Sequence, residues 1–275
     1  MKTLGGSSRQ SLLSMRDALE SKLKDLSHPG AIEFAADLFT ALTVLSSSVG
    51  VRRAFTDNSR DASAKAELIS NLFGKNIGTP AQALIANAAS LRWSSPAELA
   101  DAIEQLAVEA EASAAEKNNE LEKLENQLFD FARVLIANPD LRQALNTSAD
   151  SDTGKVSLLE AVVKGKYENS TINLLRRAVV LRRGRSIDST LTTYSHYVST
   201  RKDRLVAHIK SAIELSDAQR SKLVTALTKQ MGKQVHVNIE IDPKVLGGIS
   251  IRYADDVIDG TVFNRLAEAG RALVS

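Results

Sequence analysis

Apolar residues near the N-terminus recur in steps of three or four, which is the spacing of one helix face. One such face consists of Leu38, Leu42, Leu45 and Val49, and a second consists of Leu68, Ile69, Leu72 and Phe73. The stretches TPAQ, from Thr79, and SPAE, from Ser95, each offer a hydroxyl for an N-cap, a proline for the first helical position, and Gln or Glu three residues on. The pattern predicts a series of amphipathic helices, two of which begin at these stretches.

A helical pattern continues from Ser95 to about Ala137 with no glycine or proline after Pro96. Its middle part, VEAEASAAEKNNELEKLENQL, is polar, and we expect a break between Lys117 and Asn119. This stretch is predicted to connect two similar bundles.

An internal repeat supports that view. The segment DLFTALTVLSSSVGVRRAF, from Asp37, matches QLFDFARVLIANPDLRQAL, from Gln127, without a gap and at an offset of 90 residues. The same offset aligns Lys65 with Lys155, Leu68 with Leu158, and LIANAASLR, from Leu84, with LLRRAVVLR, from Leu174. Chance similarity between Leu-rich helices predicts drifting registers, so we interpret the match as a duplication. We call residues of about 31–107 copy one and residues of about 121–197 copy two.

The period changes after about Arg204. The stretch RLVAHIKSAI is typical of a strand, and SDAQRSKLVTALTKQM is typical of a helix with Ser216 and Gln219 as its capping box. VHVNIEI alternates strictly, and residues 249–253 form another strand pattern before a last helix from about Thr261. The order strand, helix, strand, strand, helix predicts a small α/β module.

The stretch DPKVLGGISIRYADDVIDGT, from Asp242, contains a glycine pair and several acidic residues. A phosphate-binding loop would join a strand to a helix N-terminus, but Gly247 and Gly248 lie between two predicted strands. A turn or bulge is therefore the favoured interpretation. Asp242 is expected to end a strand, and turn or cap positions are expected for Asp255, Asp256 and Asp259.

The amino-acid composition excludes several classes of protein and of binding site. Of 275 residues, 43% are hydrophobic and 25% charged, as in ordinary globular proteins. There is no cysteine, so disulfides and thiolate metal sites are excluded. The apolar runs are expected to be too short to span a membrane, and the N-terminus does not resemble a signal peptide. A net charge of +2 is too small for a general nucleic-acid binder.

Charge is unevenly distributed. Residues 95–126 hold nine acidic and two basic side chains, whereas residues 164–210 hold eleven basic and three acidic ones. The basic group includes Arg176, Arg177, Arg182, Arg183 and Arg185. Two interpretations stay open: solvated helix faces, or a basic surface that faces an acidic partner.

Catalysis has little support in the sequence. His28, His196, His208 and His236 are scattered without a metal-binding spacing, and the phosphate-loop motif is missing. We expect no catalytic, cofactor or metal site. A helical-repeat adaptor or nucleic-acid scaffold stays open as an alternative, supported weakly by the arginines and opposed by the acidic connector.

The C-terminal stretch VHVNIEIDPKVLGGISIRYADDVIDGTVFNRL resembles the signature of the delta subunit of F-type ATP synthases, the oligomycin-sensitivity-conferring protein family. The signature residues are structural in character. They are Asp242, Gly247, Gly248, Asp259, Gly260 and Thr261, the last standing where the family has Ser.

FDFARVLIANPDLRQAL, from Phe129, resembles the motif of the family's helical bundle, so copy two is identified as the family-like bundle. Copy one resembles the extra bundle of the long, actinobacterial-type form. The expected fold is α+β and mostly α, with two duplicated helical bundles and a C-terminal α/β module. The expected domains are residues 1–107, 108–203 and 204–275.

The resemblance implies a non-catalytic stator subunit in the peripheral stalk. It implies that the helical bundle binds N-terminal segments of the alpha subunits, and that the C-terminal module holds the b subunit as a separate chain. It also implies a peripheral location on the cytoplasmic face of the bacterial membrane, with no cofactor and no nucleic-acid partner.

Overall fold

The structure is a computed structural model that describes residues 4–74, 76–147, 151–203, 206–213, 215–231, 236–242, 249–253 and 256–259. The chain divides into two compact units, Met1–Ser199 and Thr200–Ser275. The first unit is helical and the second contains a sheet and a helix, so the chain is mostly α within an α+β class, as predicted.

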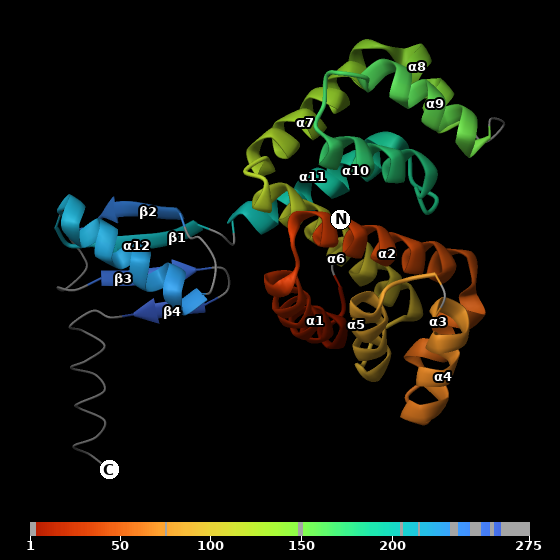
Figure 1. Ribbon diagram of the computed structural model, residues 1–275, viewed down its shortest axis with the longest axis horizontal. Coiled ribbons are helices and arrows are strands. Elements are labelled where there is room, and N and C mark those ends of the chain that lie inside the picture. Colours follow the sequence, from red (N-terminus) through yellow and green to blue (C-terminus); the bar gives the residue numbers. More distant parts are fainter. Residues whose placement is uncertain are drawn as a thin grey trace. The chain divides into compact units, whose positions relative to one another are not determined.

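The helices of the first unit fall into two groups joined at α6 (Figure 1). The first group is α1 (Gly6–Asp25), α2 (His28–Ser47), α3 (Val49–Thr56), α4 (Ala62–Phe73), α5 (Thr79–Ser90) and α6 (Pro96–Lys117). The second group is α7 (Leu121–Ala137), α8 (Pro139–Asn146), α9 (Asp152–Val163), α10 (Asn169–Val180) and α11 (Ile187–Asp203).

Helix boundaries repeat at the offset found in the sequence. Adding 90 to the bounds of α3, α4 and α5 gives 139–146, 152–163 and 169–180, which are the bounds of α8, α9 and α10. Buried positions repeat as well: Lys65 and Lys155 are both buried although lysine is rarely an interior residue. The ammonium of Lys65 donates to the carbonyl O of Ala89 at 2.7 Å, so its stem fills the core while its charge is bound by a helix end. Superposition of the two copies atom by atom stays a prediction.

Local signals set most helix ends. Ser95 caps α6 by accepting from the amide of Glu98 at 3.4 Å, as predicted. The prediction for TPAQ was wrong by one residue, because Gly78 is the N-cap and Thr79 lies inside α5. The break predicted after Lys117 is confirmed, since α6 ends there and Asn119 turns the chain with a φ of 57°. Val49 was expected on a buried face but is exposed, because α2 ends at Ser47 and a new helix begins.

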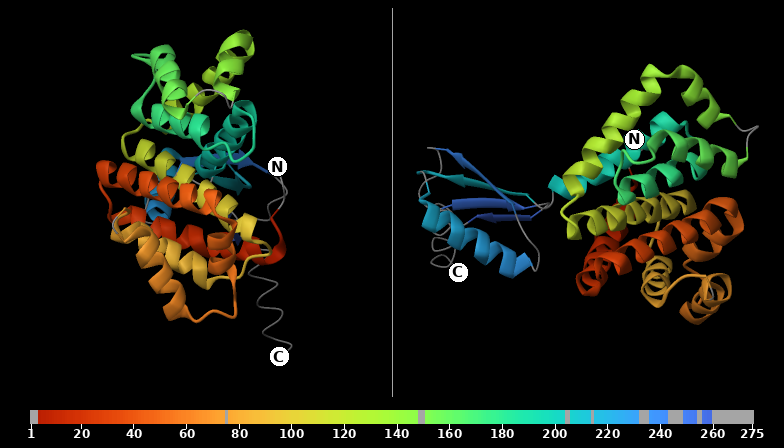
Figure 2. Two further views of the ribbon diagram at one scale, coloured as in Figure 1. Left: turned by 90° about the vertical axis from the view of Figure 1, so that its right-hand side faces the viewer. Right: turned by 45° about the horizontal axis from the view of Figure 1, so that its top comes forward.

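Helix α6 is the centre of the first unit. It lies between the helices of copy one and those of copy two, and it packs against α1, α2, α3, α7 and α10 (Figures 1 and 2). From Leu99 to Ala115 every described side chain except Asp101 is buried. Many of these residues are alanines, whose small side chains let neighbouring helices approach closely. One hydrophobic cluster includes residues of both copies, so the predicted boundary at 107/108 falls inside a shared helix.

Helix α2 is long and apolar enough to cross a membrane by length and composition, contrary to the expectation from the sequence. In this chain the apolar residues of α2 contact other helices and not a bilayer. Phe34, Leu38, Leu42 and Leu45 are buried in the core of the unit. α2 therefore has the character of a core helix of a globular unit, for which the same composition is normal.

The second unit contains a four-stranded sheet in the order β2–β1–β3–β4. Its elements are β1 (Val206–Ser211), α12 (Asp217–Met231), β2 (His236–Ile241), β3 (Ile249–Tyr253) and β4 (Asp256–Asp259). β1 and β2 are parallel and joined through α12, as a helical crossover requires, whereas β1–β3 and β3–β4 are antiparallel. Ile239, Ile209 and Ile251 are adjacent in register across the sheet, and Leu223 and Leu227 of α12 belong to the same cluster.

Three of these strands and α12 were predicted. The capping box is present: the amide of Gln219 donates to Ser216 Oγ at 3.3 Å, and the amide of Ser216 donates to Gln219 Oε1 at 2.9 Å. The strand β4 was missed, because Asp256 and Asp259 were interpreted as turn residues and are instead the two ends of a strand. The predicted last helix lies outside the described residues, as does Asp255.

Candidate functional site

The family-signature residues lie in or beside the sheet, but most of them fall outside the described residues. Asp242 follows β2, and its amide donates to the carbonyl O of Ser211 at 2.9 Å, so it extends the β1–β2 pairing by one step. Its Oδ2 lies 3.4 Å from Lys210 Nζ, a pair that is open to solvent. Asp259 pairs with Ser250 across β3–β4. Gly247, Gly248, Gly260 and Thr261 lie outside the described residues, so their structural roles stay predictions.

Helix α6 carries three buried carboxylates, which form a second set of candidate side chains. Glu104, Glu109 and Glu111 are all buried, at exposed fractions of 1%, 0% and 2%. Burying a carboxylate is costly unless it is paired, and each of these has a polar partner from another element. Glu109 binds Arg16 of α1 at 3.1 Å, and it also accepts from Gln105 at 3.0 Å. Glu109 therefore joins α6 to α1 by a polar contact as well as by apolar packing.

Glu104 holds the turn between α10 and α11. Arg183 lies 2.8 Å from Glu104 and 2.7 Å from Asp101, and Arg185 forms a short ion pair with the other oxygen of Glu104. Arg183 has a φ of 55°, which is unfavourable for a residue with a side chain, and Gly184 follows with a φ of 79°. The left-handed backbone turns the chain so that two arginines reach one carboxylate, and their ion pairs offset the strain.

These contacts show that part of the charge asymmetry is used inside the helical unit. Three acidic residues of α6, Glu104, Glu109 and Glu111, are buried and not solvated. Arg183 and Arg185 bind Glu104 of the same chain. Arg182 donates to the carbonyl O of Asn146 at 2.8 Å, and Arg176 pairs with Glu160 at 2.8 Å. Because these arginines are engaged inside the unit, the cluster gives little support to the nucleic-acid alternative.

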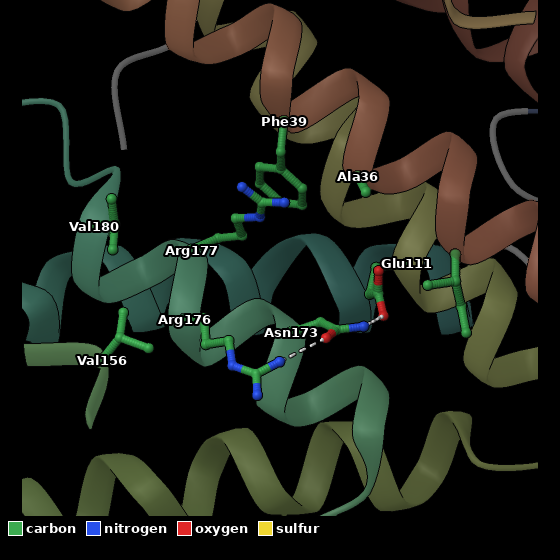
Figure 3. A pocket seen from close by; sticks show the side chains of 9 residues that line it. Ala36, Phe39, Glu111, Val156, Asn173, Arg176, Arg177 and Val180 are labelled. Atoms are coloured by element: carbon green, nitrogen blue, oxygen red, sulfur yellow. Dashed lines mark hydrogen bonds between the residues drawn. The ribbon is translucent and has the colours of Figure 1, made fainter. Parts of the chain in front are cut away.

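A groove of about 390 Å³ lies where α2, α6, α9 and α10 meet (Figure 3). Its apolar wall is formed by Ile32, Ala36, Phe39, Val156 and Val180, and its polar wall by Glu111, Asn173, Arg176 and Arg177. The guanidinium carbon of Arg177 lies 5.4 Å from the centre of the Phe39 ring, which is a cation–π contact between α10 and α2. Figure 3 shows this arginine directed toward the ring and Asn173 directed toward Glu111.

Glu111 is the titratable group at the base of this groove. Asn173 Nδ2 donates to its Oε1 at 3.0 Å. Burial raises the pKa of Glu111 to about 7. The hydrogen bond from Asn173 acts in the opposite direction, as do the nearby Ser170 hydroxyl and the charges of Arg177 and His28. The carboxyl group therefore changes charge near neutral pH at the contact between the two copies.

The arrangement suits contact between helices. The described residues contain no cluster of His, Asp and Glu with which a metal ion could be held. The groove has one apolar wall and one polar wall, which is the form of a helix–helix interface. No nucleophile lies beside a base among its lining residues.

Sequence reasoning did not find Glu109, Glu111 or the contact of Arg177 with Phe39. An available signal was the composition of VEAEASAA, in which alanines occupy every helix face around the carboxylates. A helix with small apolar residues on all sides is buried on all sides, so its charged residues require partners.

Comparisons with known proteins place the chain in the family that its sequence resembles. The family described as ATP synthase delta (OSCP) subunit matches residues 103–273. The ATP synthase subunit delta of Streptomyces coelicolor is 38% identical over 275 residues, which is 100% of both chains. The ATP synthase subunit delta of Streptomyces avermitilis is 37% identical over 273 residues, 99% of this chain and 100% of that protein. The subunit of the same name in Kineococcus radiotolerans is 40% identical over 237 residues, which is 86% of each.

Proposed function

The chain belongs to the ATP synthase delta (OSCP) family. We propose that it acts as a rigid stator link between the catalytic head and the peripheral stalk of a rotary ATP synthase. It is a non-catalytic subunit of the peripheral stalk. The observation that carries the mechanical part of the proposal is α6, which is buried along its length and shared by both helical copies. A stator must resist torque, and a helix packed on all sides with internal ion pairs cannot rotate or bend without breaking its contacts.

The two compact units divide the task. The helical unit binds N-terminal segments of the alpha subunits of the catalytic head, and the C-terminal sheet unit holds the b subunit. The resemblance in two separate stretches of the chain supports this division, since one stretch lies in copy two and the other in the sheet unit. Two contacts on one chain act at high effective concentration, so the joint is tighter than either contact alone.

The subunit is associated with a membrane complex through its partners. We place it on the cytoplasmic face of the membrane, with b as a separate chain that provides the anchor. The burial of α2 in the core of the helical unit is consistent with this arrangement, because it leaves the most apolar of the described helices unavailable to a bilayer.

A truncation after Asp203 tests the division of labour. The fragment retains α1–α11 with their common core and lacks the sheet unit. We expect it to bind the purified catalytic head with an affinity close to that of the whole chain, and to lose binding of b. Each partner is measured separately by calorimetry, with the whole chain as control. If the fragment holds b as tightly as the whole chain does, the division is wrong.

A further inference from the structure

An apolar stripe is exposed on the outer side of α7. Phe129 and Ile136 have exposed fractions of 63% and 69%, and they are seven residues apart, which places them on one helix face. A shallow hollow of about 640 Å³ lies beside them, on the same helix and at the start of α8. It is lined by Asp130, Arg133, Val134, Ile136, Ala137 and Asn138. Large apolar side chains gathered in this way on a surface mark an interaction site more often than single ones do.

The duplication supplies a comparison within the same chain. At the offset of 90, Phe129 corresponds to Phe39 of α2, which is 1% exposed because copy two covers it. Arg177 of α10 lies over the Phe39 ring, and the Tyr194 ring of α11 lies 6.3 Å from it. Copy two has no third copy after it among the described residues, so its corresponding face stays open.

Positions near this stripe on α7 are more apolar than the corresponding positions of α2, as expected for a docking face. Arg133, Ile136 and Ala137 correspond to Thr43, Ser46 and Ser47. In copy one the end of this face carries hydroxyl groups. Thr43 and Ser47 are exposed and their hydroxyls bond back to their own helix, whereas Ser46 Oγ is buried. Copy two carries an isoleucine and an alanine at the matching places, although both are exposed. Solvation alone does not account for that change, whereas a partner on this face does.

The chemistry of the partner follows from the charges around the stripe. Residues 120–140 hold five acidic side chains and two basic ones, and the basic Lys123 is already paired with Glu168 at 2.8 Å. An acidic border around an aromatic residue suits a helix that is basic on its apolar side. Within the chain α10 has this character, because it places Arg177 over Phe39. A second copy of the chain is a poorer match, since its α5 is packed against α1 and α4 and carries Asn87 at the position of Arg177.

We propose that the stripe Phe129–Arg133–Ile136 on α7 is a second docking surface, occupied in the complex by a basic amphipathic helix of a partner subunit. The proposal rests on the proposed stator function, because it places the partner inside the same complex. The partner helix lies along α7 with a Lys or Arg side chain over the Phe129 ring and apolar residues against Ile136.

Site-specific photocrosslinking in the assembled complex tests this surface. Benzoylphenylalanine is incorporated at position 136, and at position 47 as the matched control, since Ser47 is exposed at the corresponding end of α2. We expect position 136 to crosslink to a helical segment of a partner subunit with Lys or Arg on one face, and position 47 to give at most a trace of that product. The crosslinked peptide is identified by mass spectrometry.

A binding measurement complements the crosslink. The double variant Phe129→Asp/Ile136→Asp and the control Thr43→Asp/Ser47→Asp are each titrated with catalytic head purified without this subunit. We expect binding at least tenfold weaker for the first variant and unchanged for the control, with melting temperatures of all proteins alike because every substituted side chain is exposed.

Each of the other outcomes overturns either the docking surface or the stator function. A crosslink from position 136 to a second copy of this chain, or to no partner in an assembled complex, overturns the docking surface, and so does equal weakening by both double variants. If the unmodified chain itself fails to bind the catalytic head or to enter the complex, the stator function fails first. If it binds and the α7 variant binds equally well, only the docking surface is wrong.

Discussion

Replacing Glu111 with Gln is expected to make the helical unit more stable at pH 8 and to leave its stability nearly unchanged at pH 4.5. The substitution keeps the shape of the side chain and an oxygen that accepts from Asn173, but it removes the charge. In the wild type, burial raises the pKa of Glu111 from an ordinary value of 4.5 to about 7. The folded chain therefore still holds this proton between these two pH values, whereas the unfolded chain has lost it.

The size and sign of the effect follow from proton linkage. When the folded state binds more protons than the unfolded state, the free energy of unfolding falls as pH rises. The fall begins near pH 4.5 and is complete above about pH 7. One pKa unit corresponds to about 1.4 kcal/mol, so the shift amounts to about 3 kcal/mol for this buried group. Gln does not titrate, so the variant avoids this loss and exceeds the wild type by about that amount at pH 8.

Urea unfolding from pH 4.5 to 8 measures the difference, with the fluorescence of Trp93 as the signal. Trp93 is the one tryptophan in the sequence, and it is buried in the helical unit, so it reports on the relevant core. Glu122→Gln, at an exposed position on α7, is the matched control and is expected to parallel the wild type. If the curves of Glu111→Gln and wild type are parallel over the whole range, or if the variant is the less stable at pH 8, the reasoning about burial is wrong.

Three further predictions concern other parts of the chain. Glu104→Ala leaves Arg183 and Arg185 without their shared carboxylate and is expected to lower the free energy of unfolding by about 3 kcal/mol, as measured by urea unfolding; a loss below about 0.5 kcal/mol would show that the ion pairs contribute little. Gly248→Val is expected to weaken the sheet unit and its binding of b while the helical unit stays folded, and unchanged binding by calorimetry would refute the structural role of the glycine pair. The purified chain is expected to neither hydrolyse ATP nor bind it tightly, and micromolar binding by calorimetry would contradict the stator interpretation.

The fold was predictable where the pattern was local. The helices α2 and α4, the cap at Ser95, the break after Lys117 and the strand β2 depend on near neighbours, and each was found. The constant offset found in the sequence recurs in the boundaries of α3–α5 and α8–α10, because a duplicated sequence repeats its local signals. β4 was missed for a related reason. Asp is depleted in strands, and the DVID sequence forms one only because β3 offers it a pairing edge.

The candidate site was less predictable because it depends on distant partners. Alanines around the carboxylates indicate that the helix is buried, but the sequence does not state which side chain lies opposite each carboxylate. The partner of Glu104 is 79 residues away, and the partner of Glu111 is 62 residues away. The Arg cluster was therefore interpreted as an outward surface although several of its members are directed inward.

The duplication explains why the carboxylates of α6 are buried. By the same offset, α6 corresponds to α11, which begins at Ile187, so α6 closes copy one and at the same time opens copy two. A helix that belongs to both copies is covered by them on all sides. Apolar packing alone would let either copy rotate or slide along it. Glu109 fixes α6 to α1, Glu104 fixes it to the turn before α11, and Glu111 fixes it to α10. Each ion pair or hydrogen bond is satisfied in one register only, so we expect these contacts to set the register of the two copies more than their stability. A second bundle added in this way shares its central helix with the first, so no loop alone joins the two copies.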